Sequence, residues 1–232
     1  MEIDEQNRTL IKGCKNDEIP SNIEHIGSNA FIFQSIETIK IPSSVISIGD
    51  YAFRKTLLKV VFLPPSITSI GNNAFRDCYF LENINIPTSV QTIGNEAFRG
   101  CIKLVKIKIP SGITRIGGNA FYNCSSLEKI ELPSSITTIG RMAFAGCSSL
   151  KSVKLSDSLI SIKSGVFSRC INLSEISIPS SVQTIDSWAF KGCKSLKKIT
   201  FMLKTKNITK MVFYECSPLL TINTETDTES SN

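Results

Sequence analysis

The sequence predicts a β-rich repeat solenoid, in which about nine units of 22–23 residues stack into one elongated domain. An Ala-Phe or Val-Phe dipeptide recurs along the whole chain, and in seven of the nine units a cysteine follows the phenylalanine by three positions. Such a regular period is typical of a solenoid, in which each repeat buries its apolar face only against its neighbours. A fold with one central core does not require it. The recurring phenylalanines are Phe31, Phe53, Phe75, Phe98, Phe121, Phe144, Phe167, Phe190 and Phe213.

Each unit follows the pattern I-P-S-S-I-T-x-I-G-x-x-A-F-x-x-C-x-x-L-x-x-I-x, and residues 109–131 are its clearest copy. The segment with Leu127, Ile130 and Leu132, which extends one residue past this copy, ends in period-two alternation, and this predicts a short strand. Stacked copies would form a parallel sheet, and the residues between the inward positions would point outward. These outward residues are Lys40, Phe62, Asn85, Lys108, Glu131, Lys154, Ser177 and Thr200.

The rest of the unit predicts a return path around the coil. Proline ends the strand because it cannot donate a hydrogen bond to the ladder. The S-S-I-T-x-I-G piece predicts a second extended segment, turned by a glycine that can adopt a positive φ. The A-F-x-x-C piece predicts a short turn of 3₁₀ or α helix, with the phenylalanines stacked into a spine.

Residues 1–222 are predicted to form a single domain. Residues 1–13 are expected to cap its N-terminal end and residues 203–222 its C-terminal end, because the segment MLKTKNITKMVF at residues 202–213 has lost the repeat's proline and glycine. Residues 223–232 are expected to form a disordered acidic tail. The segment SPLLTI begins a strand that no further repeat covers, so end-to-end homodimers are one expectation.

Composition argues against an enzyme. Hydrophobic residues make up 41% of the chain and charged residues 20%, and His25 is the only histidine. One histidine excludes most metal sites and most His-dependent catalysis, and His25 replaces Ser, Thr or Arg at an exposed repeat position. We therefore expect no catalytic residues, no metal and no cofactor.

The cysteines are predicted to be structural thiols. Seven of the eight occupy one repeat position, which Gln34 and Thr56 fill in the first two units. A small buried side chain or a turn hydrogen bond tolerates such replacements, whereas a disulfide framework does not. The sequence contains no C-x-x-C pair, the spacing typical of a zinc site, so we expect no zinc.

No apolar run is long enough to span a bilayer, and the first ten residues are polar where a signal peptide needs a basic start and an apolar stretch. We expect no membrane insertion and a cytoplasmic location. The alternative is the cell surface, reached by a non-classical route.

The repeated I-P…I-G-x-x-A-F-x-x-C…L-x-x-I pattern resembles the BspA-like, or Treponema-type, leucine-rich repeat over residues 14–222. The resemblance implies a right-handed leucine-rich-repeat horseshoe whose concave, strand-lined face recognises proteins. It also implies a link to surface proteins of bacteria and parasitic protists that act in adhesion and matrix binding.

Exposed apolar residues suggest where a partner would bind. Val60 and Phe62 occupy outward strand positions that are polar in most other copies, and Tyr79 and Phe80 replace the usual Ser-Ser. Together they predict an apolar partner site, while local packing between the irregular 22-residue units is the alternative. Trp188, with Met142 and Met211 at equivalent positions, predicts a weaker contact stripe.

Charged residues add to this surface. Glu131 lies one strand from both Lys108 and Lys154, which predicts a cross-strand charge ladder on the concave face. A second basic patch is predicted at Lys191, Lys194, Lys197 and Lys198. It could contact an acidic protein or an anionic lipid, but nucleic acid is not favoured, because interleaved aromatic residues and any known nucleic-acid module are absent.

The sequence thus predicts non-enzymatic protein–protein recognition through the concave face. One alternative is a surface adhesin that binds host or extracellular-matrix proteins. Another is a regulatory or inhibitory subunit of a protein phosphatase 1-type enzyme. Lys59 begins residues 59–62, KVVF, and residues 198–201 read KITF; both resemble the K/R-V/I-x-F docking motif for that catalytic subunit.

Overall fold

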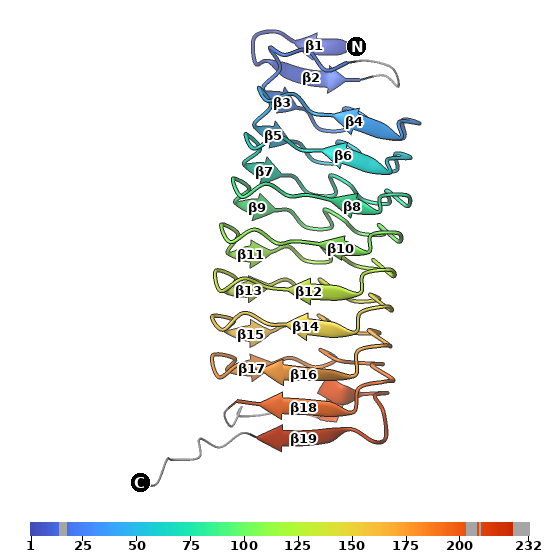
Figure 1. Ribbon diagram of the computed structural model, residues 1–232, viewed down its shortest axis with the longest axis vertical. Coiled ribbons are helices and arrows are strands. Elements are labelled where there is room, and N and C mark those ends of the chain that lie inside the picture. Colours follow the sequence, from blue (N-terminus) through green and yellow to red (C-terminus); the bar gives the residue numbers. More distant parts are fainter. Residues whose placement is uncertain (14–17, 203–207, 209, 225–232) are drawn as a thin grey trace.

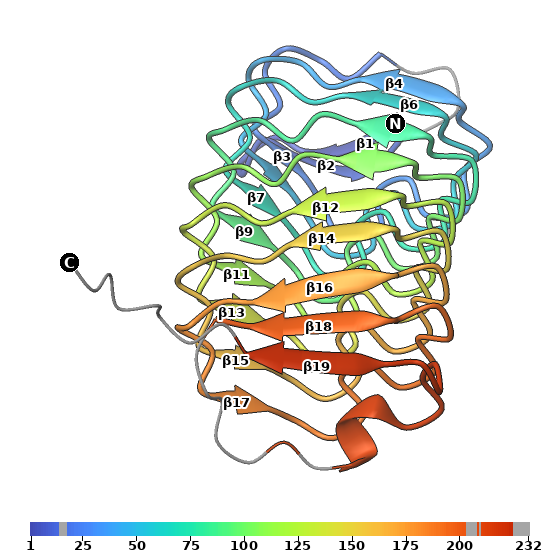
Figure 2. The ribbon, with the colours of Figure 1, turned by 60° about the horizontal axis from the view of Figure 1, so that its bottom comes forward.

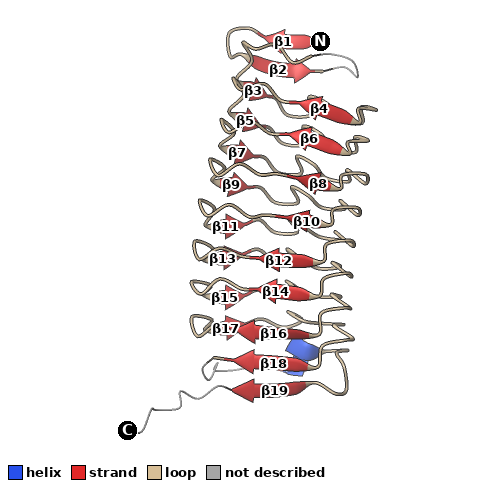
Figure 3. Cartoon of the chain, viewed as in Figure 1, coloured by secondary structure: helices blue, strands red, loops and turns tan. Residues whose placement is uncertain are grey.

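The computed structural model describes residues 1–13, 18–202, 208 and 210–224, and these residues form a solenoid of short strands (Figure 1). Each full turn contributes one strand to each of two parallel sheets, and the chain returns through a segment of tight turns (Figures 1 and 3). The predicted β-rich solenoid is confirmed, including the second extended segment of each repeat.

The first sheet contains the N-terminal hairpin and the strands that follow each Pro-Ser turn. Its order is β1-β2-β3-β5-β7-β9-β11-β13, and a two-stranded sheet, β15-β17, follows it. The bounds are β1 (Glu2–Asp4), β2 (Thr9–Lys12), β3 (His25–Ile26), β5 (Ser47–Ile48), β7 (Ser69–Ile70), β9 (Thr92–Ile93), β11 (Arg115–Ile116), β13 (Thr138–Ile139), β15 (Ser161–Ile162) and β17 (Thr184–Ile185).

The second sheet contains the L-x-x-I-x strands in the order β14-β12-β10-β8-β6-β4, and a three-stranded sheet, β16-β18-β19, continues it (Figure 2). We call the outward side of all nine strands the strand face. Their bounds are β4 (Thr38–Lys40), β6 (Val60–Phe62), β8 (Asn83–Ile84), β10 (Lys106–Ile107), β12 (Lys129–Glu131), β14 (Ser152–Lys154), β16 (Glu175–Ile178), β18 (Lys198–Phe201) and β19 (Thr221–Thr224).

The core is a continuous column of repeated side chains. Phe31 through Phe190 of the recurring set are fully buried, and every ring stacks on the ring of the next turn. Ring centroids are 5.1 Å apart at the first pair and 5.9 Å apart at the last. The predicted phenylalanine spine is confirmed, and each repeat buries its apolar face against its neighbours.

The A-F-x-x-C segments before the last unit are not helical, which corrects the prediction, whereas Val212-Phe213 of the last unit lie in a 3₁₀ helix. In residues 119–124 the amides of Tyr122 and Cys124 bond to carbonyls three residues earlier, but Asn119 and Asn123 have φ of 52° and 57°. These left-handed residues break each segment into tight turns. Among the described residues the single helical element is η1, a 3₁₀ helix over Lys210–Phe213. We call the surface that these segments form the turn face.

The glycine that follows the second extended segment is needed for close packing and not for a positive φ. A Cβ on Gly117 would lie 2.5 Å from the carbonyl oxygen of Gly94, and one on Gly140 would lie 2.4 Å from the amide nitrogen of Gly118. The positive φ values lie at other glycines, such as Gly100 and Gly146. Successive turns therefore approach each other at this column as closely as their backbones allow.

Both sheets are interrupted where this column loses its glycine. Lys163 stands in the place of glycine, and the ladders stop between β13 and β15 and between β14 and β16. The Phe144 and Phe167 rings are 5.7 Å apart, compared with 5.2 Å between Phe121 and Phe144. The lost glycine alone does not explain the interruption, because Asp186 fills the same position one turn later and β15 and β17 remain paired.

The ends of the described chain differ from the central repeats. β1 and β2 form an antiparallel hairpin, and β2 joins β3 in parallel, with Leu10 buried. β19 pairs with β18 and reaches Thr224, two residues into the predicted tail. Residues 225–232, and residues 203–207 and 209 of the predicted C-terminal cap, lie outside the described residues.

Candidate protein-recognition surface

The register of the strands places the outward side chains in two columns on the strand face. The first column contains Thr38, Val60, Asn83, Lys106, Lys129 and Ser152, followed by Glu175, Lys198 and Thr221. The second contains Lys40, Phe62, Asn85, Lys108, Glu131, Lys154, Ser177, Thr200 and Asn223. The predicted outward residues are exposed, except Thr200, which is 7% exposed.

The strand face carries more positive than negative charge. Its two columns contain Glu131 and Glu175 against six lysines. Those lysines are Lys40, Lys106, Lys108, Lys129, Lys154 and Lys198. An acidic partner would meet a favourable potential along most of the face.

The ion pair of Glu131 differs from the predicted ladder with Lys108 and Lys154. The Glu131 carboxylate accepts a bond from Lys129 on its own strand, with Nζ and Oε1 2.6 Å apart. This bond, and then the charge of Lys154, lower the pKa of Glu131. Residues i and i+2 of a strand share a face, so Lys129 competes with the lysines on neighbouring strands.

Val60 and Phe62 form the apolar part of the strand face. Both point outward from β6, and the Phe62 side chain is 57% exposed. At the start of the strand, Lys59 forms an ion pair with Glu37 of the preceding repeat, with Nζ and Oε2 2.7 Å apart. The predicted residues Lys59, Val60 and Phe62 therefore lie together at the strand face.

Tyr79 and Phe80 lie in the adjacent turn, just before β8. Both are exposed, and the Lys103 ammonium lies 5.3 Å from the centroid of the Phe80 ring. They border the entry edge of the strand face, whereas Phe62 lies at the end of β6. The four apolar residues therefore lie on neighbouring turns, at different positions along the strand direction.

The two segments that resemble a phosphatase-docking motif are interior strands. β6 is hydrogen-bonded to β4 on one side and to β8 on the other. β18 lies between β16 and β19, and its Phe201 is buried as the sequence predicts. Neither backbone is free to add as a strand to the edge of another protein's sheet, which is one common way to bind an extended peptide.

A hollow of about 510 Å³ lies on the strand face where the second sheet is interrupted. Its lining includes Lys154 of β14, Glu175 and Ser177 of β16, Lys198 of β18 and Met202. Sequence reasoning missed this hollow. The available signal was the unit at residues 155–167, which has Ser156 in place of proline and Lys163 in place of glycine.

The predicted basic patch is divided between two faces. Lys198 lines the hollow on the strand face, and Lys194 and Lys197 are exposed in the turn that leads to it. Lys191 lies on the turn face, where its ammonium is 5.2 Å from the centroid of the Tyr214 ring. His25 also differs from its prediction: it is half-buried, and its Nδ1 lies 2.7 Å from Ser47 Oγ.

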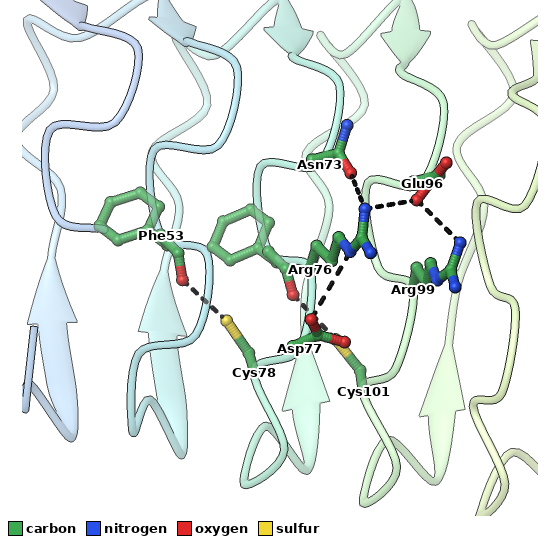
Figure 4. A network of polar contacts seen from close by, with 9 residues as sticks. Phe53, Asn73, Arg76, Asp77, Cys78, Glu96, Arg99 and Cys101 are labelled. Atoms are coloured by element: carbon green, nitrogen blue, oxygen red, sulfur yellow. Dashed lines mark hydrogen bonds and ion pairs between the residues drawn. The ribbon is translucent and has the colours of Figure 1, made fainter. Parts of the chain in front are cut away.

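The cysteine column has a structural role. The thiol of Cys78 donates to the carbonyl oxygen of Phe53, 3.0 Å away, and that of Cys101 to Phe75, 3.2 Å away (Figure 4). Thr56, at the same repeat position, donates to the same Phe53 oxygen at 2.9 Å. The prediction of one buried hydrogen-bonding position is confirmed, and burial raises the pKa of Cys78 to about 12.

The described residues contain no group of three metal-ligating side chains close enough to hold an ion. Within the same part of the chain, no helix has the length and apolar character to cross a bilayer.

Comparison with known proteins identifies the repeat. The family model for the BspA type leucine-rich repeat region matches residues 11–128 and 114–231, and the model contains six copies of the repeat. The chain belongs to this family. BspA-type leucine-rich repeats are generally non-catalytic binding modules. Among curated proteins, none matches this BspA-type chain.

Solved structures show the same fold. A leucine-rich repeat protein from Bacteroides ovatus is 32% identical with a TM-score of 0.81, over 89% of this chain and 55% of that one. A leucine rich cell surface protein from Faecalibacterium prausnitzii is 25% identical with a TM-score of 0.53, over 91% and 79%. The Treponema pallidum leucine rich repeat protein is 24% identical with a TM-score of 0.62, over 88% and 92%. This BspA-type chain therefore spans about half of the Bacteroides protein.

Proposed function

We propose that this chain is a non-catalytic recognition module that binds an acidic protein through the strand face, the face that the family resemblance identifies as concave. The observation that carries the proposal is the pairing of six lysines with an exposed Phe62 on one preformed surface. An aromatic side chain that a partner buries on binding, with complementary charges around it, is a common source of binding energy between proteins.

The rigidity of the face supports this role. Its strands are joined by ladders within two sheets, β4 to β14 and β16 to β19, and the stacked phenylalanine rings lie in the core behind them. A surface that is already ordered loses little conformational entropy when a partner binds. The hollow between β14 and β18 offers a second contact for the same partner, next to Lys154 and Lys198.

An affinity capture with matched variants tests the proposal. Wild type, Phe62→Asp, Lys154→Glu and Phe33→Asp are immobilised, and the captured proteins are identified by mass spectrometry. Phe33 is a suitable control because it is 61% exposed but lies on the turn face. We expect one acidic partner to be retained by Phe33→Asp and lost by the other two variants.

Binding of that partner, once purified, should weaken as salt is raised to about 0.5 M, because exposed charges are then screened. A partner that binds Phe62→Asp and Lys154→Glu as well as wild type would contradict the strand face. Phosphatase activity in the captured fraction would support the docking-motif alternative, which otherwise stays a prediction. Mixed dimers of tagged and untagged chain would reveal the predicted end-to-end pairing.

A surface adhesin is the second candidate, favoured by the match to the Faecalibacterium cell surface protein over 91% of this chain. Labelling of intact cells with a membrane-impermeant reagent distinguishes it from the cytoplasmic location expected from the sequence. Labelled chain, together with binding to an extracellular-matrix protein that Phe62→Asp abolishes, would support the adhesin. Chain that is labelled only after lysis would contradict it.

A further inference from the structure

The turn face is covered by long side chains in its N-terminal half. The position after each recurring phenylalanine holds Arg54, Arg76, Arg99 and Tyr122 in successive turns. Arg76 donates to Glu96 at 2.8 Å, and Arg99 donates to the same Glu96 oxygen at 3.1 Å (Figure 4). The Arg99 guanidinium carbon also lies 4.8 Å from the centroid of the Tyr122 ring. Because these side chains contact one another from one turn to the next, they cover the surface between the turns in this half of the face.

The same repeat positions hold small residues in the following two turns. Ala145 and Ser168 succeed Tyr122 in its column, and Gly146 and Gly165 occupy the flanking columns. Their small size leaves a hollow of about 340 Å³ on the turn face, which we call the turn-face hollow. That volume lies at the lower end of the range typical of ligand pockets, and it suits one large side chain better than an extended molecule.

The turn-face hollow has large apolar side chains on its walls, next to the polar Ser164 and Ser168. Met142 and Trp188 stand on either side of Gly165, and Tyr122 lies at the N-terminal end. A Cβ on Gly165 would lie 2.9 Å from the Cγ of Met142, so the glycine allows the Met142 side chain to lean over it. Met142 remains 42% exposed and Trp188 45% exposed.

Met142 and Trp188 also have unfavourable backbone conformations. Their φ values are 54° and 66°, in the left-handed region, where Asn73 and Asn119 serve at the same repeat position. Asparagine tolerates this region, but large side chains rarely adopt it. Tyr51 and Glu96 share this column with φ of 58° and 57°, so the conformation belongs to the repeat, and what distinguishes Met142 and Trp188 is their large apolar side chains.

The rim of the turn-face hollow is positively charged. Arg169 and Lys191 line it, and none of its lining residues is acidic. Within the described part of the chain, the Arg169 guanidinium makes no ion pair, whereas Arg76 and Arg99 share Glu96 in the closed half of the face. The hollow therefore offers a space between two large apolar side chains, with an unpaired cation beside it.

We propose that the turn-face hollow binds a peptide segment that presents a large apolar side chain next to a carboxylate. The side chain packs between Met142 and Trp188, over the small residues at positions 145, 165 and 168. The carboxylate pairs with Arg169. This site is separate from the strand face, so its success or failure is independent of the function proposed above.

Trp188 is the only tryptophan of the chain, so its fluorescence reports directly on the turn-face hollow. The probe is the tripeptide Asp-Phe-Asp, acetylated and amidated at its ends, and it is titrated into the purified full chain. The control peptides are Asp-Ala-Asp, which lacks the apolar side chain, and Lys-Phe-Lys, which reverses the charge. We expect a saturable change in emission with the probe and none with the controls.

Two variants locate the binding. Ser168→Tyr fills the turn-face hollow with a residue that its column already accepts at Tyr122 and Tyr214, while Ser168→Ala leaves it open. We expect Ser168→Tyr to raise the Kd of the probe at least about tenfold, because a filled pocket excludes the phenylalanine, and Ser168→Ala to leave it unchanged. Arg169→Gln, at an exposed position, should raise the Kd about threefold.

Circular dichroism melts establish that each variant is folded before its titration. The proposal is overturned if Ser168→Tyr binds the probe as tightly as wild type, or if Lys-Phe-Lys binds equally well. An emission that stays constant up to millimolar probe overturns it too. A response to N-acetylglucosamine in place of the tripeptide would assign the hollow to carbohydrate and overturn the peptide assignment.

Discussion

The thiol of Cys124 donates a hydrogen bond to the carbonyl oxygen of Phe98, 3.2 Å away in the preceding turn. Cys147 repeats this bond to Phe121, also at 3.2 Å. The bond joins the two most regular columns of the repeat across each turn boundary. Burial raises the pKa of Cys124 well above its ordinary value, so the cysteine acts as a hydrogen-bond donor and not as a nucleophile.

The first prediction concerns thiol reactivity. Cys216 is half-buried, and a hydrogen bond with Cys193 lowers its pKa, whereas the same bond and burial raise the pKa of Cys193. In a Cys14→Ser background, native chain near pH 8 should therefore alkylate first at Cys216. The other column cysteines should react only after unfolding, as peptide mass spectrometry can follow. Equal rates at Cys101 and Cys216 would contradict the buried column.

The second prediction concerns alkaline pH. Burial raises the pKa of Cys78 and Cys147 from 9.0 to about 12. A raised folded-state pKa gives stability that is complete below pH 9, and that is lost as pH rises toward 12 because the unfolded thiol ionises first. Each such thiol should remove about 1.4 kcal/mol per pH unit in this window.

Urea unfolding near pH 7.5 and near pH 10.5 measures this loss. Cys147→Thr is the matched variant, because Thr56 occupies the same column and makes the equivalent hydrogen bond. Threonine does not ionise, so this variant should lose less stability than wild type between the two conditions. An identical loss in both chains would show that Cys147 does not contribute.

The sequence predicts burial well because each column is repeated. Phe62 and Phe201 follow the same type of motif, yet the strand alternation correctly places the first outside and the second in the core. The repeat also predicts two strands per turn, since both apolar segments recur with the same spacing. Because equivalent positions recur in every turn, the residue types found at one position in several turns indicate together whether that position is buried or exposed.

Features that depend on side-chain choice or backbone approach were not predictable in this way. Glycine at position 117 suits either a positive φ or a close backbone contact, and the sequence cannot distinguish the two. Glu131 has lysines on its own strand and on both neighbours, and the structure selects Lys129. The turn-face hollow exists because Ala145 and Gly165 are small. A small residue does not stand out in a sequence, whereas the large residues Met142 and Trp188 do.

The third prediction tests the close approach at the glycine column. Gly117→Ala should destabilise the chain by about 2–4 kcal/mol, because its Cβ would lie 2.5 Å from the Gly94 carbonyl oxygen. Gly118→Ala is the neighbouring control. Its Cβ would lie 3.6 Å from the nearest atoms, so we expect a change within about 1 kcal/mol. Denaturant midpoints of the two variants provide the measurement, and similar losses would refute the packing role.

The fourth prediction tests the phenylalanine spine. Phe121 is fully buried, and its ring stacks on Phe98 at 5.5 Å and on Phe144 at 5.2 Å. Phe121→Ala removes both stacking contacts and leaves a cavity, so it should cost about 3–5 kcal/mol.

Phe62→Ala removes an equally large side chain from the strand face, where it is 57% exposed, and should cost less than about 1 kcal/mol. In a solenoid each turn is stabilised mainly by its neighbours, so the loss at Phe121 should also increase amide hydrogen exchange in the turns on both sides. Comparable melting temperatures for the two variants, or faster exchange confined to residues 119–124, would contradict a continuous spine.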